Sequence, residues 1–72
     1  MNAIIFGKRL KRLRKNRSIT QKQFANRICV SVSTIRRYEE GVKFPDKPRL
    51  NSIANELNVS LDFLLGINQE EK

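Results

Sequence analysis

The chain has 72 residues, among them fifteen lysines and arginines and seven aspartates and glutamates, which give a net charge of +8. A chain this short forms one domain with a small core and has no room for a substrate cleft beside a catalytic framework. Histidine is absent, and the single cysteine, Cys29, excludes an internal disulfide and a multi-cysteine zinc site. We therefore expect a protein that is not an enzyme and that holds no metal or cofactor.

Positive charge is concentrated in the first half of the chain. Residues 1–38 contain eleven positive side chains and no negative one, whereas residues 39–72 contain four positive and seven negative ones. A solvated surface normally mixes both signs, so this asymmetry, with an isoelectric point near 10.4, indicates a polyanionic partner. No apolar run approaches the roughly 20 residues that cross a bilayer, and a single cysteine fits a reducing compartment, so we expect a cytoplasmic protein.

The pattern predicts five helices and no strand, and therefore an all-α fold class. The helices are expected at residues 3–16, 21–28, 32–40, 47–57 and 61–65. The first rests on Phe6, Leu10 and Leu13, which repeat at the spacing of one helical stripe, while basic residues take its other faces. Residues 1–66 should form the folded domain, and residues 67–72 a flexible tail.

Three of the helix starts share one signature, in which an apolar residue before a polar cap packs onto another apolar residue inside the helix. These are Ile19-Thr20 with Phe24, Val30-Ser31 with Ile35, and Val59-Ser60 with Leu64. Thr20 also has Gln23 three residues further on, which completes a capping box, and each cap contributes about 1 kcal/mol. Gly41 is expected to end the third helix in the left-handed conformation, and Asp46 to cap the fourth.

The second and third helices form a pair that is small enough to offer one helix to a nucleic-acid groove. At 100° per residue, Ile35 and Tyr38 of the third helix point toward the core. The outward side carries the predicted base contacts, which are Val32, Ser33, Arg36 and Arg37. Arginine recognises guanine through two bonds, valine can contact a thymine methyl group, and serine can bond to several base edges. The alternative is an ordinary solvated helix face.

A second group of residues is placed to contact phosphates. Gln21, at the exposed start of the second helix, can meet a phosphate with its side chain and with the free N–H groups beside it. Further phosphate contacts are expected from Thr34, Lys43, Lys47 and Arg49. The last three flank the loop after the third helix, where they can clamp the backbone. Each neutralised phosphate should steepen the salt dependence of binding by about one unit of slope.

Two segments carry a known pattern, TQKQFANRICVSVSTIRRYEEG at residues 20–41 and LNSIANELNVSLDFLL at residues 50–65. They resemble the XRE-type family of phage-repressor and Cro-like helix-turn-helix regulators. The resemblance implies a five-helix, lambda-repressor-like domain that binds paired half-sites of double-stranded DNA as a homodimer and regulates transcription, as a repressor. It also places Ser31 on the phosphate side, and it implies a salt bridge between Arg14 and Glu39, which joins the first and third helices in relatives.

Two residues depart from the family pattern. Relatives usually have glycine in place of Cys29, so either the turn needs a positive φ and cysteine adds strain on the order of 1 kcal/mol, or the turn takes another path. The thiol is expected to be a small buried apolar group rather than a redox sensor. Glu40 lies on the outward side of the third helix, where it contacts a cytosine amino group, points past the backbone or weakens non-specific binding.

Two other functions remain open from the sequence. The first helix is cationic with an apolar stripe, as membrane-surface helices are, although so small a core needs that stripe. A protein-interaction module of the antitoxin type, which also binds DNA, is the other alternative. A group of apolar residues at the end of the chain either forms a patch for self-association or closes the core beneath Phe63. Its members are Phe44, Leu61, Leu64, Leu65 and Ile67.

Overall fold

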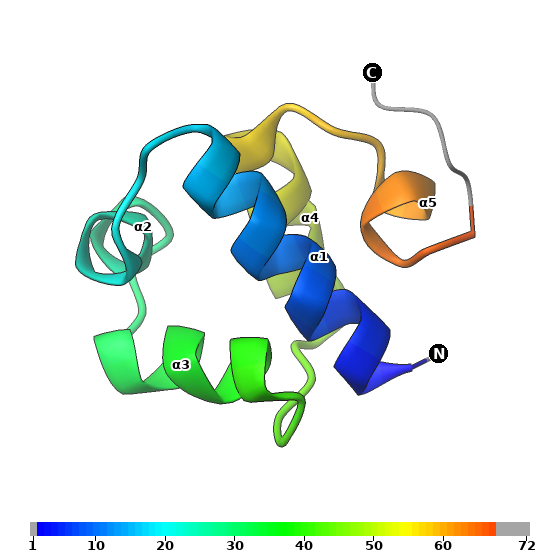
Figure 1. Cartoon of the computed structure of the whole chain (residues 1–72), viewed down its shortest axis with the longest axis horizontal. Coiled ribbons are helices and arrows are strands. Elements are labelled where there is room, and N and C mark those ends of the chain that lie inside the picture. The colour runs from blue at the N-terminus through cyan, green and yellow to red at the C-terminus, as the bar shows by residue number, and fades with distance from the viewer. Residues whose placement is uncertain (1, 68–72) are drawn as a thin grey trace.

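The structure, a computed structural model, describes residues 2–67 and folds them into five helices (Figure 1). The helices are α1 (Ala3–Asn16), α2 (Gln21–Arg27), α3 (Val32–Glu40), α4 (Lys47–Leu57) and α5 (Leu61–Leu64). No strand occurs in this part of the chain, so the expected all-α class is confirmed. The expected bounds differ at two ends only, because Ile28 caps α2 and Leu65 caps α5. No helix in the described range is long and apolar enough to cross a membrane.

The expected C-terminal tail falls mostly beyond the part of the chain that the structure describes. Ile67 donates its N–H to the carbonyl oxygen of Asp62 at 2.9 Å, so the chain is still attached to α5 at this residue. The rest of the expected tail, residues 68–72, lies outside the described residues.

Each helix begins at a side chain that accepts a hydrogen bond from a backbone N–H of the first turn. The caps are Asn2, Thr20, Ser31, Asp46 and Ser60. The capping box of α2 is complete, because Thr20 Oγ1 accepts from the N–H of Gln23 at 3.0 Å and Gln23 Oε1 accepts from the N–H of Thr20 at 2.9 Å. The predicted apolar residues before the caps pack inward, since Ile19 and Val59 are buried and Val30 lies against the core.

The core lies between α1 and the other four helices. The stripe on α1 is fully enclosed, and the ring of Phe6 meets the edges of Tyr38 and Phe44 at centroid distances of 6.1 and 5.2 Å. The other fully buried large side chains come from α2 to α5 and are Phe24, Ile35, Ile53, Leu57 and Leu64. Because every helix contributes to this core, each is held in a fixed relation to α1.

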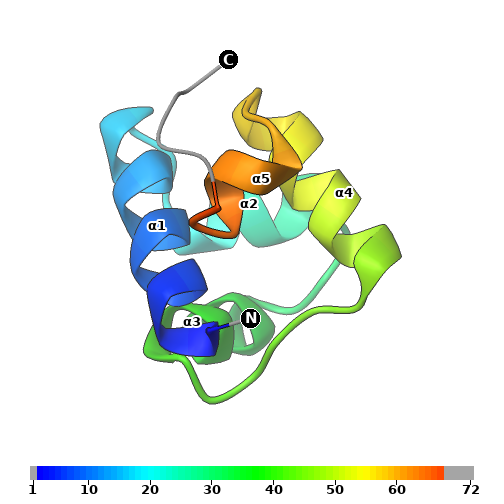
Figure 2. The same ribbon diagram turned by 90° about the vertical axis from the view of Figure 1, so that its right-hand side faces the viewer.

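α1 and α3 approach each other closely at Gly7. A Cβ atom at this residue would lie 2.9 Å from the carbonyl oxygen of Glu39 and closer still to that of Tyr38. Both obstacles are backbone atoms that cannot move aside, so glycine is required where α1 presses on the end of α3. The contact determines which side of α3 is covered. In Figures 1 and 2, α3 and the loop after it form the lower edge of the molecule, with the other helices above.

Candidate nucleic-acid interface

α3 has one buried side and one open side. Ile35 and Tyr38 are 0% and 3% exposed, whereas Arg36 and Arg37 between them are exposed. The remaining predicted base contacts, Val32 and Ser33 in the first turn, are half-buried. Residues one and two positions from a buried residue point elsewhere on a helix, so the core contacts themselves direct the two guanidinium groups outward.

Tyr38 holds α3 as a neutral side chain. Burial raises the pKa of its phenol above the ordinary value of 10.0, the positive charge of Arg49 opposes this rise, and the carboxylate of Asp46 adds to it. The ring lies edge-on to Phe6, an arrangement worth about 0.5–1.5 kcal/mol beyond the buried area. The anchor of α3 is therefore uncharged at neutral pH.

The end of α3 is fixed by an ion pair to α1. Arg14 donates from Nε to Glu39 Oε2 at 2.6 Å and from Nη2 to Glu39 Oε1 at 3.0 Å, and the two side chains are 7% and 4% exposed. Arg14 Nη1 also donates to the carbonyl oxygen of Ile19 at 2.8 Å. The structure thus brings together the two residues that the family resemblance pairs, and it adds the segment before α2 to the same cluster.

Gln21 belongs to this cluster as well, which its sequence position did not reveal. Its Nε2 donates to Glu39 Oε1 at 3.0 Å, so the amide nitrogen expected at a phosphate is used inside the protein. The bond ties the first residue of α2 to the last turn of α3. The second N–H of this amide and the unpaired backbone N–H groups at the start of α2 remain available to another acceptor.

Hydroxyl groups gather at the start of α3. Ser31 Oγ lies 3.1 Å from Ser33 Oγ and 2.9 Å from Thr34 Oγ1, and it accepts from the N–H of Thr34 at 3.2 Å. The predicted base contact Ser33 and the predicted phosphate contacts Ser31 and Thr34 therefore form one hydrogen-bonded group. Ser31 Oγ uses all three of its bonding positions within this group, whereas the hydroxyls of Ser33 and Thr34 keep spare capacity for a further partner.

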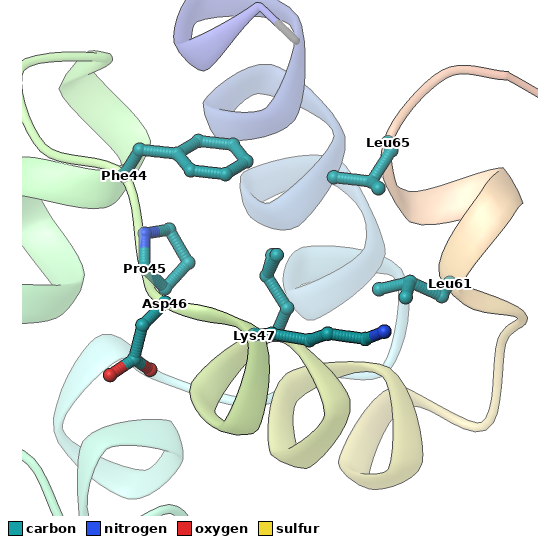
Figure 3. A pocket seen from close by; sticks show the side chains of 7 residues that line it. Phe44, Pro45, Asp46, Lys47, Leu61 and Leu65 are labelled. Carbon is teal, nitrogen blue, oxygen red and sulfur yellow. The ribbon is translucent and has the colours of Figure 1, made fainter.

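The basic residues after α3 separate into three environments. Lys43 is exposed in the loop, as a phosphate contact requires. Lys47 extends along α4 toward Leu61 and away from α3 (Figure 3). Arg49 is half-buried and donates from Nη1 to the carbonyl oxygen of Ile28 at 2.8 Å, so its guanidinium caps the end of α2 with one of its five N–H donors. A guanidinium near a helix C-terminus is favourable because it satisfies an orphan carbonyl.

The turn between α2 and α3 contains the one cysteine, and its backbone is left-handed there. Cys29 has a φ of 61°. Of the two alternatives left open by the sequence, the turn therefore needs a positive φ at this residue, and cysteine carries backbone strain there. The expectation that the thiol is buried was wrong, because Cys29 is exposed. The turn is held by the bond from the N–H of Val30 to the carbonyl oxygen of Ala25 at 3.0 Å, and Ala25 is buried where α2 meets α3.

Much of the basic charge of α1 lies away from α3. The guanidinium groups of Arg9 and Arg12 lie over the ring of Phe63 in α5, at 4.9 and 5.9 Å from its centroid. Gly7 and Arg14, by contrast, mark the side of α1 that faces α3. Arg9 and Arg12 therefore lie on the side of α1 that faces α5 rather than α3.

Comparison with known proteins places this arrangement in a family. A helix-turn-helix family profile matches residues 10–64. The HTH-type transcriptional regulator YqaE of Bacillus subtilis (strain 168) is 37% identical over 68 residues, which are 94% of this chain and 59% of that protein. The HTH-type transcriptional regulator ImmR of the same organism is 36% identical over 66 residues, 92% of this chain and 52% of that protein. The chain thus spans a little over half the length of these two relatives.

A solved structure shows the same fold. The DNA-binding domain of the P22 C2 repressor, determined in solution, matches with a TM-score of 0.82 at 27% sequence identity, over 99% of this chain and 96% of that domain. The family profile covers α2, α3 and α4 entirely, including the two-sided helix described above. The chain belongs to the helix-turn-helix family, among the XRE-type transcriptional regulators that its sequence resembles.

Proposed function

We propose that the protein is a sequence-specific regulator of transcription that binds double-stranded DNA with α3 in the major groove. The observation that carries the proposal is the division of α3 into two sides. Ile35 and Tyr38 fix one side in the core, while Arg36 and Arg37 leave the other side basic and exposed. The major groove admits an α-helix, and arginine is the side chain that most often recognises guanine there.

The dimensions of α3 suit this role. Its nine residues make a helix about 13.5 Å long, and the major groove, about 12 Å wide, accommodates the diameter of about 10–12 Å that a helix has with its side chains. Val32 and Ser33 occupy the first turn, which reaches base edges in helix-turn-helix complexes, and the two arginines follow one turn later. We assign the base contacts to these four residues, with Arg37 and Arg36 supplying most of the discrimination.

The phosphate contacts that we propose follow the structure rather than the sequence alone. Lys43 is exposed beside the end of α3, and Thr34 keeps bonding capacity at its start, whereas Ser31 would have to exchange one of its present bonds for a phosphate. Gln21 contributes through its backbone N–H and through the second N–H of its amide, since Glu39 accepts only one of the two. Lys47 points away from α3 (Figure 3), so we rank it behind Lys43, and Arg49 both caps α2 and keeps further N–H donors for a phosphate.

We further propose that the protein binds DNA as a dimer of identical chains. A pocket of about 460 Å³ opens between α4 and α5 (Figure 3). Its apolar lining comes from Phe44, Pro45, Leu50, Leu61 and Leu65. Of the apolar group noted in the sequence, Leu64 closes the core, Phe44, Leu61 and Leu65 remain at this surface, and Ile67 is 68% exposed.

A second copy of the chain is the occupant that suits this pocket. A two-fold interface brings the same patch of both copies together, so the patch must complement itself. Asp46 and Lys47, of opposite charge, both line the pocket, and their side chains point apart (Figure 3), so the acid of one copy can pair with the base of the other across a two-fold axis. Two copies of α3 related in this way would read half-sites about one helical turn of DNA apart.

Repression is the mode of action that needs least from the protein. A bound dimer blocks access to the DNA that it covers, whereas activation requires a further surface for another protein. We place this action in the cytoplasm, together with the DNA. Selection of bound duplexes from a random pool tests the proposal, which predicts a palindromic consensus containing guanine in each half. If no sequence were enriched, specific binding would be contradicted. If the enriched motif lacked symmetry, binding as a dimer would be contradicted.

A further inference from the structure

Glu40 brings a negative charge to the exposed side of α3, where the proposed interface is otherwise neutral or basic. Residues 1–38 contain no acid, and the other glutamate of α3, Glu39, is turned inward to Arg14. Two helical turns separate Glu40 from Ser33 and one turn separates it from Arg36, so these side chains share one side of the helix. Glu40 and Arg36 are both exposed.

Within residues 2–67, no cation lies at ion-pair distance from this carboxylate. Among the described residues the ion pairs join Arg14 to Glu39 and Arg27 to Glu56, and Glu40 takes part in neither. The side chain of Glu40 also makes no hydrogen bond with the described part of the chain. Its charge therefore contributes nothing to holding the helices together, and it remains available to act on a ligand.

The position of Glu40 along α3 places it at the edge of the groove. Recognition helices of helix-turn-helix proteins meet base edges with their N-terminal residues, so the last turn of a helix about 13.5 Å long lies farther out, toward the phosphates that line the groove. Glu40 is the last residue of α3, followed by the left-handed Gly41 and by the exposed Lys43. A carboxylate at this point meets phosphates rather than bases.

We infer that Glu40 limits the affinity of the protein for DNA by repelling the phosphate backbone, a role that rests on the proposed function. Phosphates are the same in every duplex, so the repulsion acts on cognate and non-cognate DNA alike. The ratio between the affinities for cognate and non-cognate DNA is therefore determined by the base contacts of α3. The protein consequently leaves non-cognate duplexes faster without losing discrimination.

Glu40→Gln tests this role, because glutamine keeps the size and helix propensity of glutamate and removes only its charge. The dissociation constant is measured by fluorescence anisotropy for the selected duplex and for a scrambled one, across a series of salt concentrations. At low salt the variant should bind both duplexes about three- to tenfold more tightly, by the same factor for each. The salt dependence should steepen by up to about one unit of slope.

Asp62→Asn is the matched control, since it changes the net charge equally at an exposed residue of α5. Its affinity should equal that of the wild type. An equal gain in DNA affinity in both variants, or no change in affinity for Glu40→Gln, would overturn the inference. A loss of affinity by Glu40→Gln for the selected duplex alone would also overturn it and would make Glu40 a base contact. Failure of the wild type to bind any duplex would instead reject the proposed function, and Arg37→Ala reports on that function independently of Glu40.

Discussion

Glu39 receives Arg14 in two hydrogen bonds, 2.6 Å from Nε and 3.0 Å from Nη2, at a place where both side chains are almost fully buried. The pair joins the last turn of α1 to the end of α3, and Gln21 adds the start of α2 to the same carboxylate. Three helices therefore meet at one charged contact, directly behind the side of α3 that we propose to face DNA. Loss of either partner leaves an unpaired charge in a small core.

Glu39→Ala should lower the free energy of unfolding by about 3–5 kcal/mol, because it leaves the guanidinium of Arg14 buried without its counter-charge. In a domain of this size each kcal/mol lowers the melting temperature by about 4–8 °C, so circular dichroism melts resolve the effect easily. Glu56→Ala breaks the exposed pair with Arg27 and should cost no more than about 1 kcal/mol. A melt of Glu39→Ala that matches the wild type would show that the buried pair is dispensable.

Arg37→Ala should weaken binding to the selected duplex by about 1–3 kcal/mol and relax the preference at one position of each half-site. The fold should be unaffected, since the side chain is exposed and joins none of the ion pairs among the described residues. Anisotropy titrations with the selected duplex and with single-position substitutions measure both effects. An equal loss on every sequence would identify Arg37 as a phosphate contact instead.

Cys29→Gly should raise the free energy of unfolding by about 0.5–1 kcal/mol. A non-glycine residue in the left-handed region costs about 1–2 kcal/mol, and the greater backbone freedom of glycine in the unfolded chain returns part of that gain. Cys29→Ala removes the thiol and keeps the strain, so its chemical denaturation curve should stay close to that of the wild type. If alanine stabilised the domain as much as glycine, the thiol rather than the backbone would be responsible.

Alkaline pH should unfold the protein partly through Tyr38. Burial raises the pKa of this phenol, so its neutral form contributes stability that is complete below about pH 10 and is lost as the pH rises through the raised value. The chain has one tyrosine and no tryptophan, so the ultraviolet absorbance of tyrosinate follows Tyr38 alone. Tyr38→Phe should lose less stability than the wild type over this pH range, and a titration of Tyr38 at the ordinary pKa would speak against burial of the phenol.

Leu61→Glu should convert the dimer to monomers, because it places a charge in the apolar pocket between α4 and α5. Leu61 is the first residue of α5, where glutamate suits a helix start, so the fold itself should survive. Asn55→Glu adds the same charge at an exposed position of α4 and should leave the dimer intact. Sedimentation equilibrium distinguishes the two results, and a Leu61→Glu variant that still sediments as a dimer would place the interface elsewhere.

The helices and the side of α3 that faces outward were predictable from the sequence, because both depend on local patterns. Apolar spacing and polar caps set the helix bounds to within one residue, and Ile35 and Tyr38 alone determine which way Arg36 and Arg37 point. The partners of long polar side chains were not predictable in this way. Gln21 and Arg49 both found acceptors inside the protein, and those acceptors, Glu39 and the carbonyl oxygen of Ile28, lie far from them in sequence.

The close contact at Gly7 and the exposure of Cys29 also became visible only in three dimensions. A glycine in the middle of an amphipathic helix carries no signal of the backbone that lies against it. The exposure of Cys29 follows from the path of the turn. The glycine that relatives have at this position pointed to a positive φ, but it gave no information on whether the side chain would be buried.

The proposed contact between Arg37 and guanine is tested most directly by removing the guanine atom that Arg37 should bind. Each guanine of the selected duplex is replaced in turn by 7-deazaguanine, which lacks the N7 acceptor of the major groove and keeps the minor-groove edge unchanged. One replacement in each half-site should weaken the wild type about tenfold or more and should have no further effect on Arg37→Ala. Equal binding of every substituted duplex by the wild type would contradict the placement of α3 in the major groove.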